Sequence, residues 1–348
     1  MQGRELCHIP PYLDEETAMV EKTISHYEIL EKLAEGASGT VYKAQDTKRD
    51  RLVALKFLPI RQKLSGSDKE KLRQDATNAA LLAHPCICAF YSLKVEKDDY
   101  FVVMEFVDGK SLKSSMPIMN NQVAINFAIA ICSAFQEAHA NGVLHRNLRC
   151  HSVMVNSKRR IKILGFGLAD LKDVLKLERP AGTAEDAAYM SPEQIKGAAV
   201  DPRSDVFSLG VLFYHMLSDQ LPFRGEHEAA MLNSVQNEQT IPIRQYRPDL
   251  SPGFVSIIER ALEKRPADRY QTVGEMLAEL RHLKRASFSI SKVFNRPSGD
   301  TRKPVTKPFI RFQGKTSGMP WRKMLPMLLG ILALILLAVF VIRALINP

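Results

Sequence analysis

The sequence predicts an α+β fold in which a small strand-rich part is followed by a larger helical part, a linker and one C-terminal transmembrane helix. Polar and apolar residues alternate in residues 27–33, and residues 52–58 have the length and composition of a second strand. Apolar residues at helical spacing, as in residues 123–131, fill the second half of the chain. The transmembrane prediction rests on an uncharged apolar run near the end of the sequence.

The composition is that of a globular protein, with 45% hydrophobic and 25% charged residues among 348. These proportions exclude the disordered and collagen-like classes and allow one or two domains. Five cysteines are too few for a disulfide framework on a chain of this length, and none is spaced as in a paired CxxC metal site. We therefore expect reduced, mostly buried thiols.

The net charge of +10 belongs to the C-terminal part of the chain. Residues 285–348 contain eleven Lys and Arg but one acid, Asp300, whereas residues 1–284 contain 37 basic and 37 acidic residues. A balanced surface exerts no general attraction on polyanions. We therefore expect no nucleic acid partner.

A transmembrane helix is predicted at residues 324–346. Its central run, Met324–Ile342, is uncharged and long enough to cross the ~30 Å hydrocarbon layer of a bilayer. Trp321 fits an interfacial anchor, and the basic residues just before the helix place the rest of the chain in the cytoplasm by the positive-inside rule. A buried core helix is the alternative. We expect a single-pass C-terminal membrane anchor, with membrane lipid as one partner.

Two further segments flank the globular part. Residues 1–26 are an N-terminal extension, and residues 285–323 are rich in Ser, Pro, Gly, Lys and Arg without helical or strand periodicity. We predict that residues 285–323 form a basic, flexible juxtamembrane linker. Each basic residue near an anionic leaflet would contribute on the order of 1 kcal/mol to membrane binding. A merely solvated spacer is the alternative.

A candidate phosphate-binding loop lies between the first two predicted strands. Gly36 and Gly39 would let the backbone approach phosphates closely, and Lys56 on the following strand would add a point charge. Most glycine pairs of this kind only mark turns. The Val-Ala-Leu-Lys run that ends at Lys56 makes the combination more specific.

Four motifs follow this loop in order. They are Asp75 ahead of His84-Pro85, His145–Ser152, Gly165–Gly167, and Met190–Glu193 with Ser204–Gly210 behind it. With these motifs, residues 27–284 resemble a protein kinase domain, most similar to the bacterial Ser/Thr kinases of the eukaryotic type. The resemblance implies a two-lobed kinase-like fold, with a five-stranded antiparallel sheet and one helix in the small lobe, a large helical lobe, and nucleotide in the cleft between them.

Three departures from the family pattern concern catalysis. In the family, the catalytic loop contains an aspartate that accepts the substrate's proton and an asparagine that holds Mg²⁺; these positions are Asn147 and Ser152 here. The aspartate of the D-F-G motif, which holds the metal that bridges the phosphates, is Gly165. An amide is not basic, and loss of a positioned base typically costs about 10²- to 10⁴-fold in rate. The resemblance therefore implies that catalytic residues and a metal site are missing.

Other positions change less or are intact. Asp75 replaces the glutamate that pairs with the strand lysine and is one methylene shorter, so its pair with Lys56 should be stretched or absent. Arg149 replaces the catalytic-loop lysine and keeps its charge but not its geometry. The positions that resemble structural residues of the large lobe are His145, Phe166, Asp205, Glu193 and Arg269.

The positions that the resemblance implies in nucleotide binding are intact. The glycine loop and lysine would contact phosphates, apolar side chains would enclose adenine, and a backbone segment would bind its edge. The expected residues are Gly36, Gly39, Val41, Ala54, Lys56, Glu105, Val107 and Met154. Each apolar residue alone fits plain core better than a nucleotide contact, because apolar residues in strands are usually core. We expect ATP as a ligand, bound without Mg²⁺, or no nucleotide at all.

These observations together predict a pseudokinase, a membrane-tethered signalling scaffold that binds a protein partner, such as an active kinase, instead of transferring phosphate. One alternative is an active or weakly active Ser/Thr protein kinase that uses ATP and a non-standard metal arrangement. Asp170 is the nearest acid after Gly165 in the chain. The other alternative is an adaptor that binds anionic lipid through the basic linker.

Overall fold

The computed structural model describes residues 22–36, 39–59, 65–96, 99–115, 119–169 and 183–294. All of them belong to the first of two compact units, Met1–Asn295, and the second unit is Arg296–Pro348. The predicted transmembrane helix at residues 324–346 and the predicted linker from residue 295 onward lie outside the described residues, as does most of the N-terminal extension.

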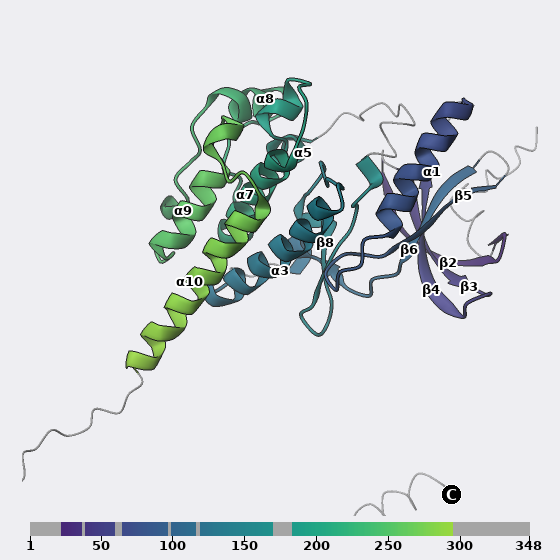
Figure 1. Cartoon of the computed structure of the whole chain (residues 1–348), viewed down its shortest axis with the longest axis horizontal. Helices are drawn as coiled ribbons and strands as arrows, with labels where there is room; N and C mark the ends of the chain where they lie inside the picture. Colours follow the sequence, from purple (N-terminus) through teal and green to yellow (C-terminus); the bar gives the residue numbers. More distant parts are fainter. Residues whose placement is uncertain are drawn as a thin grey trace, which may run out of the picture. The chain divides into compact units, whose positions relative to one another are not determined.

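An antiparallel sheet of six strands forms the small lobe, in the order β1-β2-β3-β4-β6-β5 (Figure 1). The strands are β1 Thr23–Ile24, β2 Tyr27–Gly36, β3 Gly39–Asp46, β4 Arg51–Leu58, β5 Phe90–Glu96 and β6 Asp99–Glu105. The two-residue strand β1 pairs with the start of β2 through Thr23 and Glu28, so the sheet has one strand more than predicted.

Helix α1 (Gly66–Ala80) covers one face of this sheet (Figure 1). The side chain of Ser65 caps the helix, because its hydroxyl accepts a hydrogen bond from the N–H of Asp68 at 3.1 Å. Leu72, Ala76 and Ala79 lie on one helical face and pack with sheet residues in a single apolar cluster. This packing holds α1 against β5 at the edge of the sheet.

The large lobe is mainly helical. Its helices are α2 Leu112–Ser115, α3 Asn121–Ala140, α5 Ala184–Ala188, α6 Pro192–Ile195, α7 Pro202–Ser218, α8 Glu228–Asn237, α9 Pro252–Ala261 and α10 Val273–Phe294. A small sheet of order β7-β8-β9, with β7 Lys110–Ser111, β8 Val153–Val155 and β9 Ile161–Ile163, lies next to the small lobe. The predicted two-lobed kinase-like architecture is therefore confirmed.

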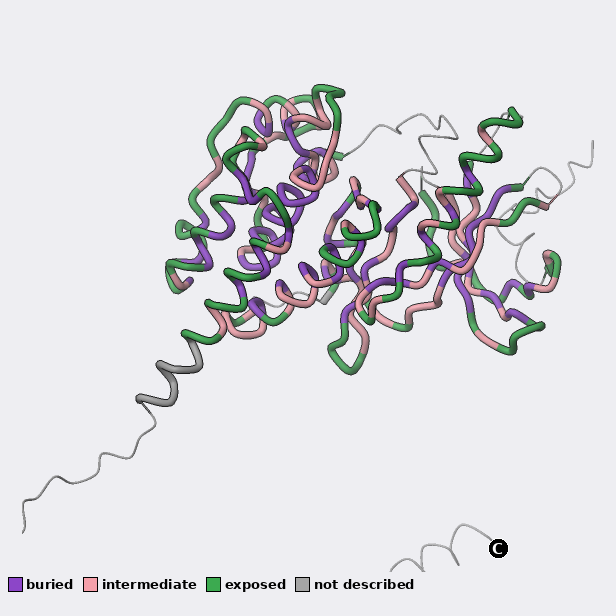
Figure 2. The backbone as a smooth tube through the Cα atoms, viewed as in Figure 1, coloured by how far each residue is buried: buried purple, intermediate pink, exposed green. Residues whose placement is uncertain are grey.

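The core of the large lobe is built around α7. Residues 204–217 of this helix are all buried, and Figure 2 shows buried residues concentrated where the helices of this lobe meet. The start of the helix is fixed at Pro202, because Asp201 accepts a hydrogen bond from the N–H of Arg203 and Pro202 occupies the first helical position. Most of these residues are apolar, and a helix with apolar residues on every side has to be buried.

Among the described residues, α3 is the one helix long and apolar enough to cross a membrane. Ala128, Ile131 and Phe135 of α3 are buried in the main cluster of the large lobe. Its apolar character is therefore explained by packing inside the lobe.

Helix α10 corrects one boundary. Residues 285–294, expected to begin the flexible linker, continue α10 to Phe294. This stretch contains neither glycine nor proline, and the first proline after it is Pro297. The helix therefore meets no residue that would break it before its end.

Candidate functional site

The glycine hairpin between β2 and β3 lies close to β4. Gly36 and Gly39 are the last pair of the β2–β3 ladder. Gly39 has a φ of +108°, and a Cβ atom there would lie 1.8 Å from the carbonyl oxygen of Phe57. Residue 39 therefore has to be glycine. Nothing lies within 4 Å of a Cβ at Gly36, so packing does not require glycine there.

Lys56 of β4 lies between two neighbouring strands of the sheet. It is paired with Val41 of β3 and Val102 of β6 and is partly buried. Within the described part of the chain, Oδ2 of Asp75 on α1 is buried without a hydrogen-bond partner. The shorter acid thus leaves one buried oxygen unsatisfied.

An apolar cluster lies beside the segment that joins the lobes. Buried Ala54 and Met104 form this cluster together with partly buried Val41 and Val107. The backbone N–H and C=O of Val107 hydrogen-bond to no other described group, which leaves one donor and one acceptor for the edge of a planar ligand. The structure therefore brings together three of the predicted adenine-contacting residues.

Glu105 and Met154 are placed differently from these three. The Glu105 carboxylate accepts hydrogen bonds from Lys162 of β9 at 2.8 Å and from the N–H of Ala89 at 3.1 Å. Its side chain therefore connects β6 to β9. Met154 of β8 is paired with Lys162 and is not a member of the apolar cluster.

Asp205 of α7 holds the backbone of the catalytic-loop region. It accepts hydrogen bonds from the N–H groups of His145 and Arg146, both at 2.9 Å, and contacts Nε2 of His139 at 2.8 Å. Burial alone would raise the pKa of Asp205, but the hydrogen bonds from His139 and His145 outweigh burial and lower the pKa. The loop is thus fixed by an ionised, buried carboxylate.

Three aromatic rings pack together beside this loop. His145 lies parallel to Phe135, with centroids 5.5 Å apart, and meets Phe166 edge-on at 4.8 Å. Nε2 of His145 donates a hydrogen bond to the carbonyl oxygen of Leu164 at 3.0 Å. This bond joins the loop to the residue just before Gly165. The predicted structural positions His145, Phe166 and Asp205 therefore form one connected unit.

At the position of the catalytic base, Asn147 is bonded inside the protein. Nε and Nη2 of Arg149 donate to Oδ1 of Asn147 at 3.2 and 2.9 Å, and Nη1 of Arg149 donates to the Asp186 carboxylate. We call these three residues the Arg149 bridge. Sequence reasoning missed Asp186, although its three-residue spacing from Thr183 is typical of a capping box.

Helix α5 carries the far end of the Arg149 bridge. Thr183 and Asp186 cap the helix reciprocally, and Glu185 pairs with Lys113 of α2 at 3.0 Å. Ala187 and Ala188 are fully buried. The helix is therefore packed onto the large lobe, and it directs an acidic first turn toward Arg149.

The positions where the family holds metal offer no carboxylate here. Oγ of Ser152 donates to the carbonyl oxygen of Asn147 at 3.4 Å, and Gly165 presents backbone alone. Mg²⁺ is usually bound through one or two carboxylates together with substrate phosphates. The described residues contain no group of three or more His, Cys, Asp or Glu able to hold a metal, and Asp170 lies outside them. The donors present at Asn147, Ser152 and Gly165 do not fit a Mg²⁺ site.

Glu193 and Arg269, the other two expected structural residues of the large lobe, form an ion pair. Arg269 is 1% exposed and donates to both Glu193 oxygens, at 2.8 and 2.9 Å. Ser204 of α7 donates a third hydrogen bond to Glu193 at 2.6 Å. The pair fixes α6 against the helical core.

Comparisons with known proteins agree with this architecture. The model of the protein kinase domain family matches residues 27–280. Serine/threonine-protein kinase PrkC of Bacillus subtilis is 30% identical over 76% of this chain and 41% of its own length, and PknB of Mycobacterium leprae is 33% identical over 73% and 42%. The chain therefore spans about two fifths of the length of these curated relatives. The crystal structure of the PknI kinase domain of Mycobacterium tuberculosis matches with a TM-score of 0.61 at 24% identity, over 76% of this chain and 98% of that domain.

Proposed function

The chain belongs to the protein kinase family, and on this premise we propose that it is a pseudokinase that binds nucleotide and acts as a signalling scaffold. The observation that carries the proposal is the chemistry at the three catalytic positions. Asn147 is an amide whose oxygen is bonded by Arg149, and neither Ser152 nor Gly165 supplies a carboxylate. Phosphoryl transfer in this family depends on a positioned base and on metal ions that neutralise charge on the phosphates. These residues provide neither.

Nucleotide binding is supported by a different set of groups. Val41, Ala54 and Val107 lie in one apolar cluster, and the Val107 backbone has a donor and an acceptor available. The glycine hairpin and Lys56 are placed on adjoining strands. ATP is the ligand that the family implies, and the scaffold would present different surfaces with and without it.

The test is the unfolding temperature of the full-length chain in detergent with ATP, with Mg²⁺ and then with a chelator. A ligand at about 100 times its Kd stabilises the folded state by roughly 2.7 kcal/mol. We expect an upward shift that persists in the chelator and is lost in Ala54→Phe, which fills the apolar cluster. A shift that requires Mg²⁺ would contradict metal-free binding.

An active Ser/Thr protein kinase is the second candidate, and the relatives favour it. PrkC and PknB, at 30% and 33% identity, are both named as serine/threonine-protein kinases. In that case the transfer of labelled γ-phosphate to a protein substrate would exceed the level of a Lys56→Met control, and restoring Asn147→Asp, Ser152→Asn and Gly165→Asp would change it little. The scaffold proposal expects no transfer above the Lys56→Met background.

Membrane tethering completes the proposal. It rests on the uncharged run at residues 324–342 and on the eleven basic residues from residue 285 onward. We expect the full chain to float with both neutral and anionic vesicles, and a chain that ends at residue 323 to float with anionic vesicles at low salt alone. If that shorter chain ignores anionic vesicles, the lipid-adaptor alternative is wrong.

A further inference from the structure

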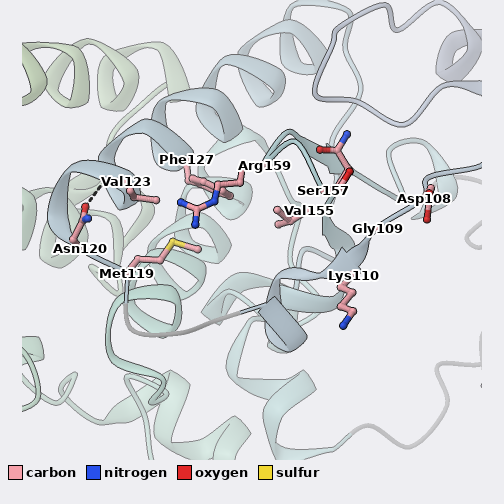
Figure 3. A pocket seen from close by; sticks show the side chains of 11 residues that line it. Asp108, Gly109, Lys110, Met119, Asn120, Val123, Phe127, Val155, Ser157 and Arg159 are labelled. Atoms are coloured by element: carbon pink, nitrogen blue, oxygen red, sulfur yellow. Dashed lines mark hydrogen bonds between the residues drawn. The ribbon is translucent and has the colours of Figure 1, made fainter. Parts of the chain in front are cut away.

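A groove of about 650 Å³ lies on the large lobe beside the segment that joins the lobes (Figure 3). Its floor is apolar and is formed by Met119 just before α3, by Val123 and Phe127 of α3 and by Val155 of β8. Figure 3 shows these side chains directed into one space, with the guanidinium of Arg159 pointing into it from the rim.

The groove is separate from the predicted nucleotide site. None of the eight residues expected to bind nucleotide lines it. Successive side chains of a strand point to opposite faces, so Val155 lines the groove while Met154 points away from it. Gly109 lies so close to β8 that a Cβ atom would be 2.7 Å from the Val155 carbonyl oxygen. The side of the groove that contains Gly109 is therefore packed directly on β8.

A basic turn, residues 158–160, stands at one rim. Lys158, Arg159 and Arg160 are exposed, and their side chains form no ion pair within the described part of the chain. Oδ1 of Asn156 accepts hydrogen bonds from the N–H groups of Lys158 and Arg160 at 3.0 and 2.9 Å, which fixes the turn with Arg159 at a φ of +55°. The three cations are thus presented on a well-defined backbone without internal partners.

The other charges near the groove are also mainly positive. Lys110 on the opposite rim is exposed, and Asp108 is the one acid among the described lining residues. The first turn of α3 contains no acidic residue, so the positive end of its dipole is not neutralised there. Asp249, bonded to Asn121 through its carbonyl oxygen, has its carboxylate paired with Arg247 at 2.8 Å.

We propose that this groove docks an acidic peptide segment of a partner protein. Apolar side chains of the peptide would occupy the floor, and its carboxylates would pair with Arg159 and its neighbours. The charge of the rim selects this occupant, because complementary charges determine which partner binds. The chain's own basic tail, residues 285–348, has the same sign as the rim and would be repelled.

The test uses the full-length chain in zwitterionic detergent and a short fluorescein-labelled peptide with two leucines followed by four glutamates. Fluorescence anisotropy should report saturable binding that weakens as salt rises. Arg159→Glu should weaken binding at least tenfold without changing the unfolding temperature, because the side chain is exposed and makes no internal bond. Lys196→Glu makes the same charge change at an exposed position outside the groove and should bind as the parent does.

Two further peptides complete the experiment. A version with lysines in place of glutamates should not bind. Equal binding of the two peptides, equal binding by Arg159→Glu, or no binding at all would overturn the proposal. The third peptide is His8–Met19 of this chain, in which Asp14, Glu15 and Glu16 follow Tyr12 and Leu13. Tighter binding of this peptide than of the designed one would assign the groove to the chain's own N-terminal extension and overturn the partner assignment.

Discussion

Gly165, which has no carboxylate, also has a backbone conformation that few other residues adopt. The residue has a φ of +105°, which side-chain-bearing residues rarely adopt, and a Cβ atom there would be 3.5 Å from Cε1 of His145. That distance is an ordinary contact, so space is available for a side chain. The obstacle to restoring an aspartate is therefore conformational strain rather than packing.

Gly165→Asp should lower the free energy of unfolding by about 1–2 kcal/mol, the cost of holding an L-residue in a left-handed conformation. Gly165→Ala should be at least as destabilising, since it meets the same backbone strain. Gly36→Ala is the control, because nothing surrounds a Cβ there and its φ is not positive. Urea unfolding measures all three. A Gly165→Asp variant as stable as the parent would show that the strain is absent.

The Arg149 bridge is the second residue-scale feature. It forms an internal chain of donors and acceptors between the catalytic-loop residue Asn147 and helix α5. Asp186 also accepts a hydrogen bond from the N–H of Thr183 at 3.2 Å. Its carboxylate therefore supports both the bridge and the start of α5.

Asp186→Ala should destabilise α5 by about 1 kcal/mol, the typical value of a lost capping interaction. Hydrogen exchange of residues 183–190 should speed up, whereas exchange in α7 should stay as slow as in the parent. Asp186→Asn keeps an acceptor for the Thr183 N–H but weakens the contact with Arg149, so its effect should be intermediate. Unchanged exchange in α5 would mean that packing of Ala187 and Ala188 alone holds the helix.

At the scale of elements, the sequence predicts those strands and helices in which apolar residues recur with the period of the buried face. The β2 region alternates and α3 has an apolar stripe, so both were predictable. Strand β1 is two residues long and exists through its pairing with β2, which no local pattern encodes. The extension of α10 was missed because polar composition was interpreted as a linker, although no residue there breaks a helix.

The candidate site was predictable to a similar, limited degree. Motif order singled out Asn147, Ser152 and Gly165, because these positions deviate from a known pattern. That they no longer support catalysis stays a prediction. Motif order did not identify the Arg149 bridge, since Arg149 and Asp186 are far apart in sequence and meet through the packing of α5. The positions of Glu105 and Met154 depend on Lys162 of β9. Lys162 forms an ion pair with Glu105 and lies opposite Met154 in the small sheet.

The contact between α1 and the Gly165–Gly167 turn is the element-scale feature that is most easily tested. Gly167 has a φ of +76°, and a Cβ atom there would lie 2.4 Å from Cβ of Ala79. Helix α1 is thus packed on this turn without room for a methyl group. Overpacking of this kind forces a shift of backbone or helix.

Gly167→Ala should destabilise the protein by about 2–4 kcal/mol, from left-handed strain together with the clash on α1. Gly142→Ala is a matched control, because Gly142 has a φ of +72° but nothing within 4 Å of a Cβ. Its cost should be the strain alone. Adding Ala79→Gly to Gly167→Ala should recover the difference between the two variants. Equal costs at residues 142 and 167 would mean that α1 does not press on the turn.

At the scale of the whole molecule, histidines inside the protein link its stability to pH. His145 and His215 are buried and His84 is partly buried. Burial lowers the pKa of all three below its ordinary value of 6.5, against the opposing effects of Asp205 on His145, of Glu185 on His215 and of Glu137 on His84. The unfolded chain therefore takes up protons at these sites before the folded protein does.

Stability should consequently fall as pH decreases from 7 to 5, because below 6.5 the unfolded state binds more protons than the folded state. Each such histidine contributes a slope of at most about 1.4 kcal/mol per pH unit. Two carboxylates affect stability at lower pH. The pKa values of Asp205 and Glu193 are lowered, so their contributions to the free energy of unfolding are fully present above about pH 4.5 and are lost only in stronger acid. Urea midpoints of the full chain at half-unit steps of pH measure the slope. His84→Gln should make it shallower while leaving the midpoint nearly unchanged at pH 8, and a flat or rising midpoint from pH 7 to 5 would show that the three rings are accessible to protons in the folded state.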